Sequence, residues 1–310
     1  MAYRLQRTES VADGLRRLAR KELRSARVRL HRAHPPSVEA VHDARKRVKK
    51  IRAIVRVIDS DGGRGLDGSA RRLRSVNRTL STLRDAAVML ETLSTLRDKY
   101  PQVLNEHTFA RVRRRLMAHV DEVTAAAGDG AWKRVDRKLR ALRKQAKRWR
   151  LAHGGFGALA PGIRHTHRRG RTAMARALER ERAADFHEWR QEMKTLWYEL
   201  RLVEGSAPQV RRDARALHRA ETWLGDDHNM AVLCDELARD RSLHGQIDLQ
   251  RLQCAADAYQ RHLREKATAL VRGIYDVTSG AYVRRIRRSW REWRRKQRRR
   301  PAAAAKRAAA

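Results

Sequence analysis

The sequence predicts an all-α protein, and three observations support this fold class. Apolar residues recur every three to four positions along nearly the whole chain, which is the spacing of one face of an α-helix. The alternation of apolar and polar residues that is typical of strands is missing. The second half of the chain also repeats, in the same order, motifs of the first half. A repeat of this size indicates two related helical units.

Four helical segments are expected in the first half, each bounded by residues that interrupt helices. The interruptions are Pro35-Pro36, the glycine-rich loop 61–65, Pro101 and Gly128-Asp129-Gly130. Ser37 follows the first interruption and is suited to cap the second helix, because a serine hydroxyl can accept a hydrogen bond from the helix's first free N–H groups.

The duplication rests on three pairs of matching segments. Residues 12–16 match 160–164, residues 42–49 match 187–194, and residues 80–89 match 224–233. The separations of these pairs are 148, 145 and 144 residues, and both changes fall in expected loops. Insertions are tolerated best in loops, so this pattern supports a genuine repeat.

The duplication predicts two tandem pseudo-symmetric four-helix bundles, one in residues 1–130 and one in residues 156–278. Residues 131–155 are expected to form a basic connecting helix and loop. Residues 279–310 are expected to form a basic C-terminal helix that Pro301 ends, followed by an alanine-rich tail.

The charge of the chain points to a polyanionic partner. Lys and Arg number 73 against 35 Asp and Glu, for a formal net charge of +38. Such a charge attracts phosphate-rich polymers at long range. Inorganic polyphosphate, nucleic acid, an acidic membrane and acidic proteins all satisfy this criterion. Aromatic residues make up only 5% of the chain, so surfaces on which bases stack are not abundant.

The second helix of each half carries the strongest candidates for anion binding. Residues on one helical face recur at spacings of three and four, and each such face here covers about 20 Å. The candidates are His42, Arg45, Lys46, Lys49 and Arg56 in the first half, and His187, Arg190, Lys194, Tyr198 and Arg201 in the second. Arg16, Arg20, Arg164 and Arg168 join them from the first helix of each half.

An alternative is that these faces are ordinary solvated surfaces. A solvated face usually interleaves acidic residues with basic ones, and these faces are one-sided in charge, so binding is favoured. Whether His42 and His187 contact a ligand or only pack is left open. Neighbouring cations disfavour the imidazolium, so each histidine is expected to be neutral before an anion arrives.

Catalytic and metal-binding patterns are weak in this sequence. No HExxH, phosphate-binding glycine loop or Ser/His/Asp elbow occurs. His165 and His167 are two apart on a helix and point to different sides, and the polar stretch 226–229 fits a helix end better than a cation site. We therefore expect no metal, no cofactor and no enzymatic activity.

The chain is expected to be cytoplasmic. Its first residues lack the apolar stretch of a signal peptide, and no apolar run is long enough to span a bilayer. Cys234 and Cys254 fall on apolar helical positions outside any metal-binding pattern, so both are expected to be buried thiols. The sequence leaves the oligomeric state open.

With the His-[Asp/Glu]-x-Arg-x-x-x-Lys pattern in both halves, and Leu80-x-x-x-Arg84-Asp85 behind the first, the chain resembles the CHAD family, the conserved-histidine α-helical domain. The resemblance covers about residues 3–275. It implies two bundles around a basic central groove or pore. It also implies binding of long-chain polyphosphate, with a place at polyphosphate granules. The family's functional residues map onto His42, Arg45, Lys49, His187, Arg190 and Lys194. Two positions depart from the family pattern, Ser81 in place of glycine and His228 in place of arginine.

Two functions follow as hypotheses. The first is binding of polyphosphate in a basic helical cavity, which targets the protein to granules or organises them. The second is nucleic-acid binding through the basic segments 131–150 and 284–300, with Trp290 and Trp293 stacking on bases.

Overall fold

The structure is a computed structural model that describes residues 3–32, 36–103, 105–126, 128–239 and 249–308. The side chains of residues 82–84, 129, 249 and 297–308 are not described, so Pro35, the Arg84 side chain and the end of the basic tail lie outside the described residues. Within the described ranges every regular element is a helix, which confirms the all-α fold class.

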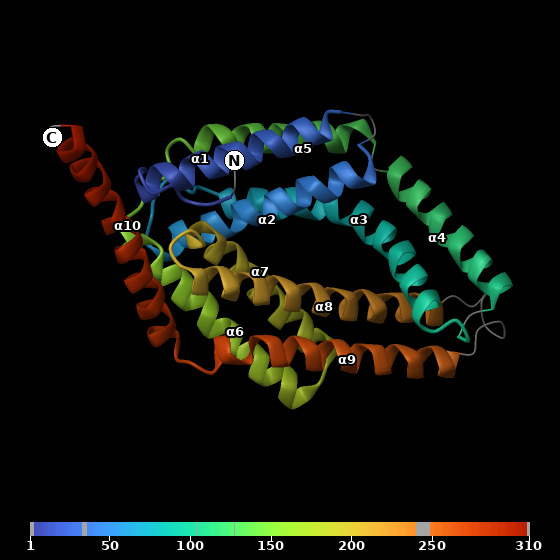
Figure 1. Ribbon diagram of the computed structural model, residues 1–310. Helices are drawn as coiled ribbons and strands as arrows, with labels where there is room; N and C mark the ends of the chain where they lie inside the picture. The colour runs from blue at the N-terminus through green and yellow to red at the C-terminus, as the bar shows by residue number, and fades with distance from the viewer. Residues whose placement is uncertain (1–2, 33–35, 104, 127, 240–248, 309–310) are drawn as a thin grey trace.

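The helices follow one another with short connections (Figure 1). Their bounds are α1 Val11–Leu30, α2 Val38–Ser60, α3 Ser69–Lys99, α4 Glu106–Ala126, α5 Asp129–Gln145, the 3₁₀ turn η1 Gly155–Ala158, α6 Ala160–Arg180, α7 Ala183–Val203, α8 Pro208–Arg239, α9 Leu249–Tyr275 and α10 Ser279–Ala308. None of the described helices is apolar over a stretch long enough to cross a bilayer.

Serine caps begin the first two helices. The Ser10 hydroxyl accepts a hydrogen bond from the Asp13 N–H at 3.0 Å, and the Ser37 hydroxyl accepts one from the Ala40 N–H at 3.2 Å. Each cap satisfies a backbone donor that the helix itself cannot satisfy. The start of α2 therefore lies where the sequence predicts it.

Consecutive helices pack on one another in both halves of the chain: α1 on α2, α2 on α3 and α3 on α4, then α6 on α7, α7 on α8 and α8 on α9. The halves also contact each other directly, through α2 with α6 and α7 and through α3 with α8. One apolar core runs through these contacts, from Leu18 and Ile54 in the first half to Leu196 and Leu217 in the second. A smaller cluster joins the far ends of α3, α4, α8 and α9.

Helix α5 occupies most of the segment that was expected to connect the halves, and it packs against α1 and α3. Trp132, Leu139 and Trp149 are buried in the main core. The basic residues of this segment therefore lie on the outer side of a packed helix. The boundaries at residues 130, 155 and 278 stay predictions.

Helix α10 continues through Pro301 to Ala308, so the expectation that Pro301 ends it was wrong. Proline removes one backbone hydrogen bond from a helix, but the alanines that follow are the strongest helix formers. The first half of α10 is firmly packed, because Tyr282, Ile286 and Trp290 form an apolar stripe in the core.

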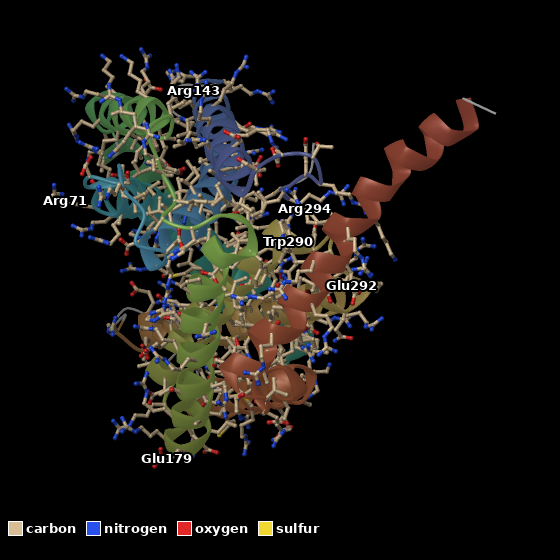
Figure 2. All side chains as sticks on the ribbon, turned by 90° about the vertical axis from the view of Figure 1, so that its left-hand side faces the viewer. Arg71, Arg143, Glu179, Trp290, Glu292 and Arg294 are labelled. Carbon is tan, nitrogen blue, oxygen red and sulfur yellow. The ribbon has the colours of Figure 1, made fainter. Side chains whose placement is uncertain are left out.

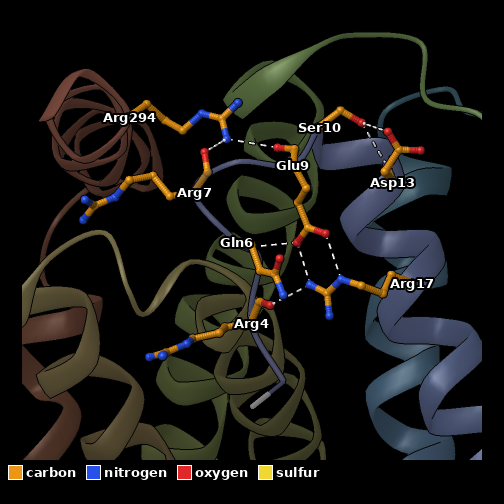
Figure 3. Close-up of polar contacts among 8 residues, drawn as sticks. All are labelled: Arg4, Gln6, Arg7, Glu9, Ser10, Asp13, Arg17 and Arg294. Atoms are coloured by element: carbon orange, nitrogen blue, oxygen red, sulfur yellow. Dashed lines mark hydrogen bonds and ion pairs between the residues drawn. The ribbon is translucent and has the colours of Figure 1, made fainter. Parts of the chain in front are cut away.

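Two polar anchors hold α10 in place. The buried His167 ring lies between Tyr275 and Tyr282 and bonds to the Ser279 hydroxyl and the Ile274 carbonyl. At the other end, the Arg294 guanidinium donates to the backbone carbonyls of Arg7 and Glu9 (Figure 3). The C-terminal helix is thereby fastened to the segment that precedes α1.

The expected stacking of Trp290 on bases is contradicted by this packing. Trp290 is only 4% exposed and lies against Phe156 and Trp293, while Trp293 is itself partly buried beneath Arg7. Figure 2 shows Trp290 directed from α10 toward the body of the molecule. The expectation for cysteine was half right, since Cys234 is buried but Cys254 is exposed on α9.

Candidate functional site

A cavity of about 780 Å³ lies between the halves, walled by α2, α3, α7 and α8. Figure 1 shows α2 and α3 on one side of this region and α7 and α8 on the other. Along α2 the wall extends from His42 to Asp59, a length of about 26 Å at 1.5 Å per residue. The cavity is therefore long enough for an extended ligand.

Most of the residues singled out in the sequence meet in this cavity. Its wall includes His42, Arg45, Lys46, Lys49, Arg56, His187, Arg190, Lys194 and Tyr198. They come together because α2 and α7 each present one basic face, and the packing of the two halves turns both faces inward.

The remaining candidates lie elsewhere. Tyr198 is the last residue of α7 on the cavity wall, and Arg201 lies beyond it, with its guanidinium 5.6 Å from the rings of Tyr3 and Trp197. Arg16 and Arg20 line a separate hollow between α1 and α5. Arg164 and Arg168 are exposed on α6 and do not line the cavity.

Several cavity residues were not among the anion-binding candidates of the sequence analysis. Arg52 and Arg74 line the wall, as do Gln191, His228 and Asn229. Arg52 is three residues after Lys49 on the same helix, so the helical spacing contained the signal for it. Arg74 lies on α3, where no matching basic pattern marks it.

The second-half cations are neutralised by one buried acid, Glu221 of α8. The Lys194 ammonium lies 2.9 and 2.7 Å from the two Glu221 carboxylate oxygens, and the Arg190 Nε donates to the Glu221 backbone carbonyl at 3.1 Å. Burial raises the pKa of Glu221, but the hydrogen bond from His218 and the charge and hydrogen bond of Lys194 outweigh burial and lower it to about 2. Glu221 is therefore ionised at neutral pH.

Gly225 gives Arg190 room to lie against α8. A Cβ atom at this position would stand 2.8 Å from the Arg190 Nη2, which is closer than non-bonded atoms approach. In the first half, the Arg45 Nη1 donates to the Ser81 carbonyl at 3.3 Å and to the Asp85 carboxylate at 3.0 Å. Both arginines are thus fixed by the helix that follows their own.

Lys49 differs from Lys194 because it makes no ion pair with Glu221. By the 144-residue offset, Asn77 stands where the second half has Glu221, and the buried Asn77 Oδ1 has no hydrogen-bond partner. Among the described side chains none makes an ion pair with Lys49. Burial and the charges of Lys194, Arg45 and Arg190 outweigh the opposing charge of Glu221 and lower the pKa of Lys49 to about 7.

His187 is held neutral in the same surroundings. Its ring centroid lies 4.1 Å from that of His228, and its Nδ1 is buried without a partner. Burial, followed by the charges of His228, Arg190 and Lys49, lowers the pKa of His187 to about 4. The lowered pKa of His187 agrees with the neutral state that the sequence analysis expects.

The charges on the cavity wall favour an anion. Eight basic side chains line it, Arg45, Lys46, Lys49, Arg52, Arg56, Arg74, Arg190 and Lys194, against the two acids Asp59 and Asp85. Clustered cations in a partly desolvated space repel one another and attract negative charge strongly. In the described part of the chain, no group of three or more His, Cys, Asp or Glu side chains is placed to hold a metal ion.

Comparisons with known proteins agree with this architecture. The family model of the CHAD domain matches residues 14–238. A search of curated proteins gave no match. Among solved structures, the chain is similar to the crystal structure of the CHAD domain from the plant Ricinus communis, with a TM-score of 0.62 and 17% identity over 90% of this chain and 96% of the other.

A second structure, PptA from Streptomyces chartreusis, is similar with a TM-score of 0.53 and 17% identity over 86% of this chain and 98% of the other. These likenesses support the helical fold, and the match to the family covers most of the chain. The chain therefore belongs to the CHAD domain family.

Proposed function

We propose that the protein binds long-chain inorganic polyphosphate in the central cavity. The observation that carries this proposal is Lys49, which is buried beside Arg45, Arg190 and Lys194 and makes no ion pair with a described acid, so that the more distant charge of Glu221 only partly offsets these cations. Bringing like charges together in this way opposes folding. A polyanion in the cavity relieves that repulsion and gains several charge-assisted hydrogen bonds.

The shape of the cavity favours a linear polymer over a single phosphate. Cations line α2 over about three turns, from Arg45 to Arg56, whereas one phosphate needs only a helix terminus or a short loop. Tyr198 is the single Phe, Tyr or Trp on the described wall, which favours a ligand with repeated charge and no bases to stack. Membership of the CHAD family agrees with this class of ligand.

The proposed biological role is to bind polyphosphate granules in the cytoplasm and organise them, as a binding module rather than an enzyme. The two halves of the duplication then act as pseudo-symmetric walls of one basic groove. Nucleic acid remains the rival ligand, because α10 presents the basic residues Arg284, Arg287, Arg288, Arg291 and Arg295 around a hollow of about 400 Å³.

Thermal melting separates these ligands. Long-chain polyphosphate should raise the melting temperature strongly, because a ligand that binds only the folded state stabilises it. Orthophosphate at equal phosphorus concentration should do much less, because it lacks multivalency. Duplex DNA of equal phosphate content is the third sample. Equal shifts from polyphosphate and orthophosphate would contradict an extended site, and a larger shift from DNA would favour the nucleic-acid alternative.

The affinity for polyphosphate is expected to fall as pH rises. Below pH 7 Lys49 is charged before the ligand arrives, since its pKa is about 7. Above this value binding must take up a proton, so affinity falls by up to about tenfold per pH unit. Titrations between about pH 6 and about pH 9 test this, where arginine keeps its charge throughout. The variant Lys49→Arg should show a flatter profile. A wild-type slope in that variant would exclude Lys49 as the titrating group.

A further inference from the structure

A second basic groove runs along the outside of the first half, between α1 and α5. These helices pack side by side (Figure 1). Two hollows of about 450 and 410 Å³ follow each other along their contact. The α1 wall extends from Asp13 to His31, about 27 Å at 1.5 Å per residue. We call this groove the outer seam.

The outer seam is as one-sided in charge as the central cavity. Its basic residues include Arg16, Arg20, Arg24 and Arg27 of α1 and, from the α5 side, Arg140, Arg143 and Lys147. Its acids are Asp13 and Asp136. Asp136 neutralises Arg27 and Arg140, with both ion pairs at 2.6 Å, and Asp13 pairs with Arg16.

Four basic residues in one half of the seam remain unpaired. Among the described residues, no acid pairs with Arg20, Arg24, Arg143 or Lys147, and the buried Arg20 Nε has no hydrogen-bond partner at all. Figure 2 shows Arg143 at the outer surface, among many exposed nitrogen atoms. Neighbouring Arg17 is different, because Glu9 holds its guanidinium (Figure 3). A row of unpaired cations is the part of the groove where a bound anion would form the most favourable charge interactions.

The geometry of the groove selects the kind of anion. Two packed helices leave a surface groove along their contact, and this groove can hold one extended chain along its length. No aromatic side chain lines the half that holds the four unpaired cations, so bases would find no stacking partner there. An extended chain with a charge at every unit and no bases fits best.

We propose that the outer seam is a second binding site for linear polyphosphate, separate from the central cavity. The seam and the cavity share no lining residue. Arg16 and Arg20, which the sequence singled out and the cavity does not contain, belong to this site. The inference rests on the proposed function for the class of ligand. Its consequence is that one molecule can hold two polyphosphate segments and link separate chains.

The test uses the full-length variant Arg20→Ala, Arg24→Ala, Arg143→Ala and Lys147→Ala. A charge-matched control replaces Arg211, Arg215, Arg261 and Arg272 with Ala, which are all exposed and line neither site. Calorimetric titration with a short polyphosphate should give two binding events for the wild type and the control. The seam variant should keep the cavity event and lose the other. Melting curves establish that each variant is folded.

Light scattering with long-chain polyphosphate provides the second readout. Linked assemblies should scatter at least about tenfold less with the seam variant, because cross-linking needs two sites per molecule. Wild-type stoichiometry in the seam variant, or an equal loss in the control, would overturn the proposal, as would a loss of DNA binding alone. If the variant Arg45→Ala, Lys46→Ala and Lys49→Met instead keeps both events at wild-type affinity, the cavity is not the principal site, and the proposal for the seam is unaffected.

Discussion

Replacing Glu221 with Gln is expected to destabilise the protein and to tighten polyphosphate binding at the same time. The Glu221 carboxylate is 3% exposed and neutralises Lys194. Removing one partner of a buried ion pair costs about 3 kcal/mol or more of unfolding free energy. The variant also releases Lys194 and Arg190 from competition, so affinity should rise about tenfold, equivalent to about 1.4 kcal/mol.

The pH dependence of this effect has a defined sign. Because the pKa of Glu221 is lowered to about 2 in the folded protein, its stabilising contribution is complete above the unfolded value of about 4.3. This contribution is lost as pH falls from the unfolded pKa of about 4.3 to the folded pKa of about 2. Urea denaturation should therefore show a large difference between wild type and Glu221→Gln at neutral pH, and a difference that shrinks as pH falls below 4.

The matched control is Glu106→Gln, which breaks an exposed ion pair with Arg97 far along the chain. Exposed pairs contribute about 1 kcal/mol or less, so this variant should keep wild-type stability and affinity. If Glu221→Gln is as stable as the control, or binds polyphosphate more weakly than wild type, then Glu221 does not restrain the second-half cations as described.

Much of the cavity could be predicted from the sequence because it is built from helix faces. The spacing of His42, Arg45 and Lys49 places them on one side of α2 whatever the surroundings, and the duplicated pattern from His187 to Lys194 does the same for α7. Spacing within one helix was enough to group these residues. The closing of both faces over one cavity came from the family resemblance and not from the spacing.

Contacts between distant helices could not be predicted in this way. The pairing of Lys194 with Glu221 depends on how α8 packs against α7, and no pattern within either helix encodes it. The same holds for the α1–α5 groove that collects Arg16 and Arg20. The expectation that Trp290 stacks on bases was wrong for a different reason, because the sequence did contain the signal for its burial. Tyr282, Ile286 and Trp290 recur at four-residue spacing, which indicates a buried stripe.

The structure also shows which cations can be replaced without destabilising the fold. Substituting Arg190 or Lys194 would leave Glu221 buried without its partners, so a loss of binding could reflect a loss of folding. The first-half wall lacks this complication. Arg45 pairs with the exposed Asp85. Lys49 makes no ion pair with a described acid, so replacing it leaves no buried carboxylate without its partner. The Lys49→Met change replaces an unpaired buried cation by an apolar chain of similar length, which should stabilise the fold.

The most direct test of the cavity as the polyphosphate site is therefore the affinity of the variant Arg45→Ala, Lys46→Ala and Lys49→Met. Its control removes three charges elsewhere, at the exposed residues Arg211, Arg215 and Arg272. Charge-assisted contacts are worth about 1.5–3 kcal/mol each, so the cavity variant should bind long-chain polyphosphate at least about a hundredfold more weakly while remaining as stable as wild type. The affinity of the control for polyphosphate should fall only a fewfold. If both variants lose affinity equally, net charge alone drives association, and the central cavity is not the site.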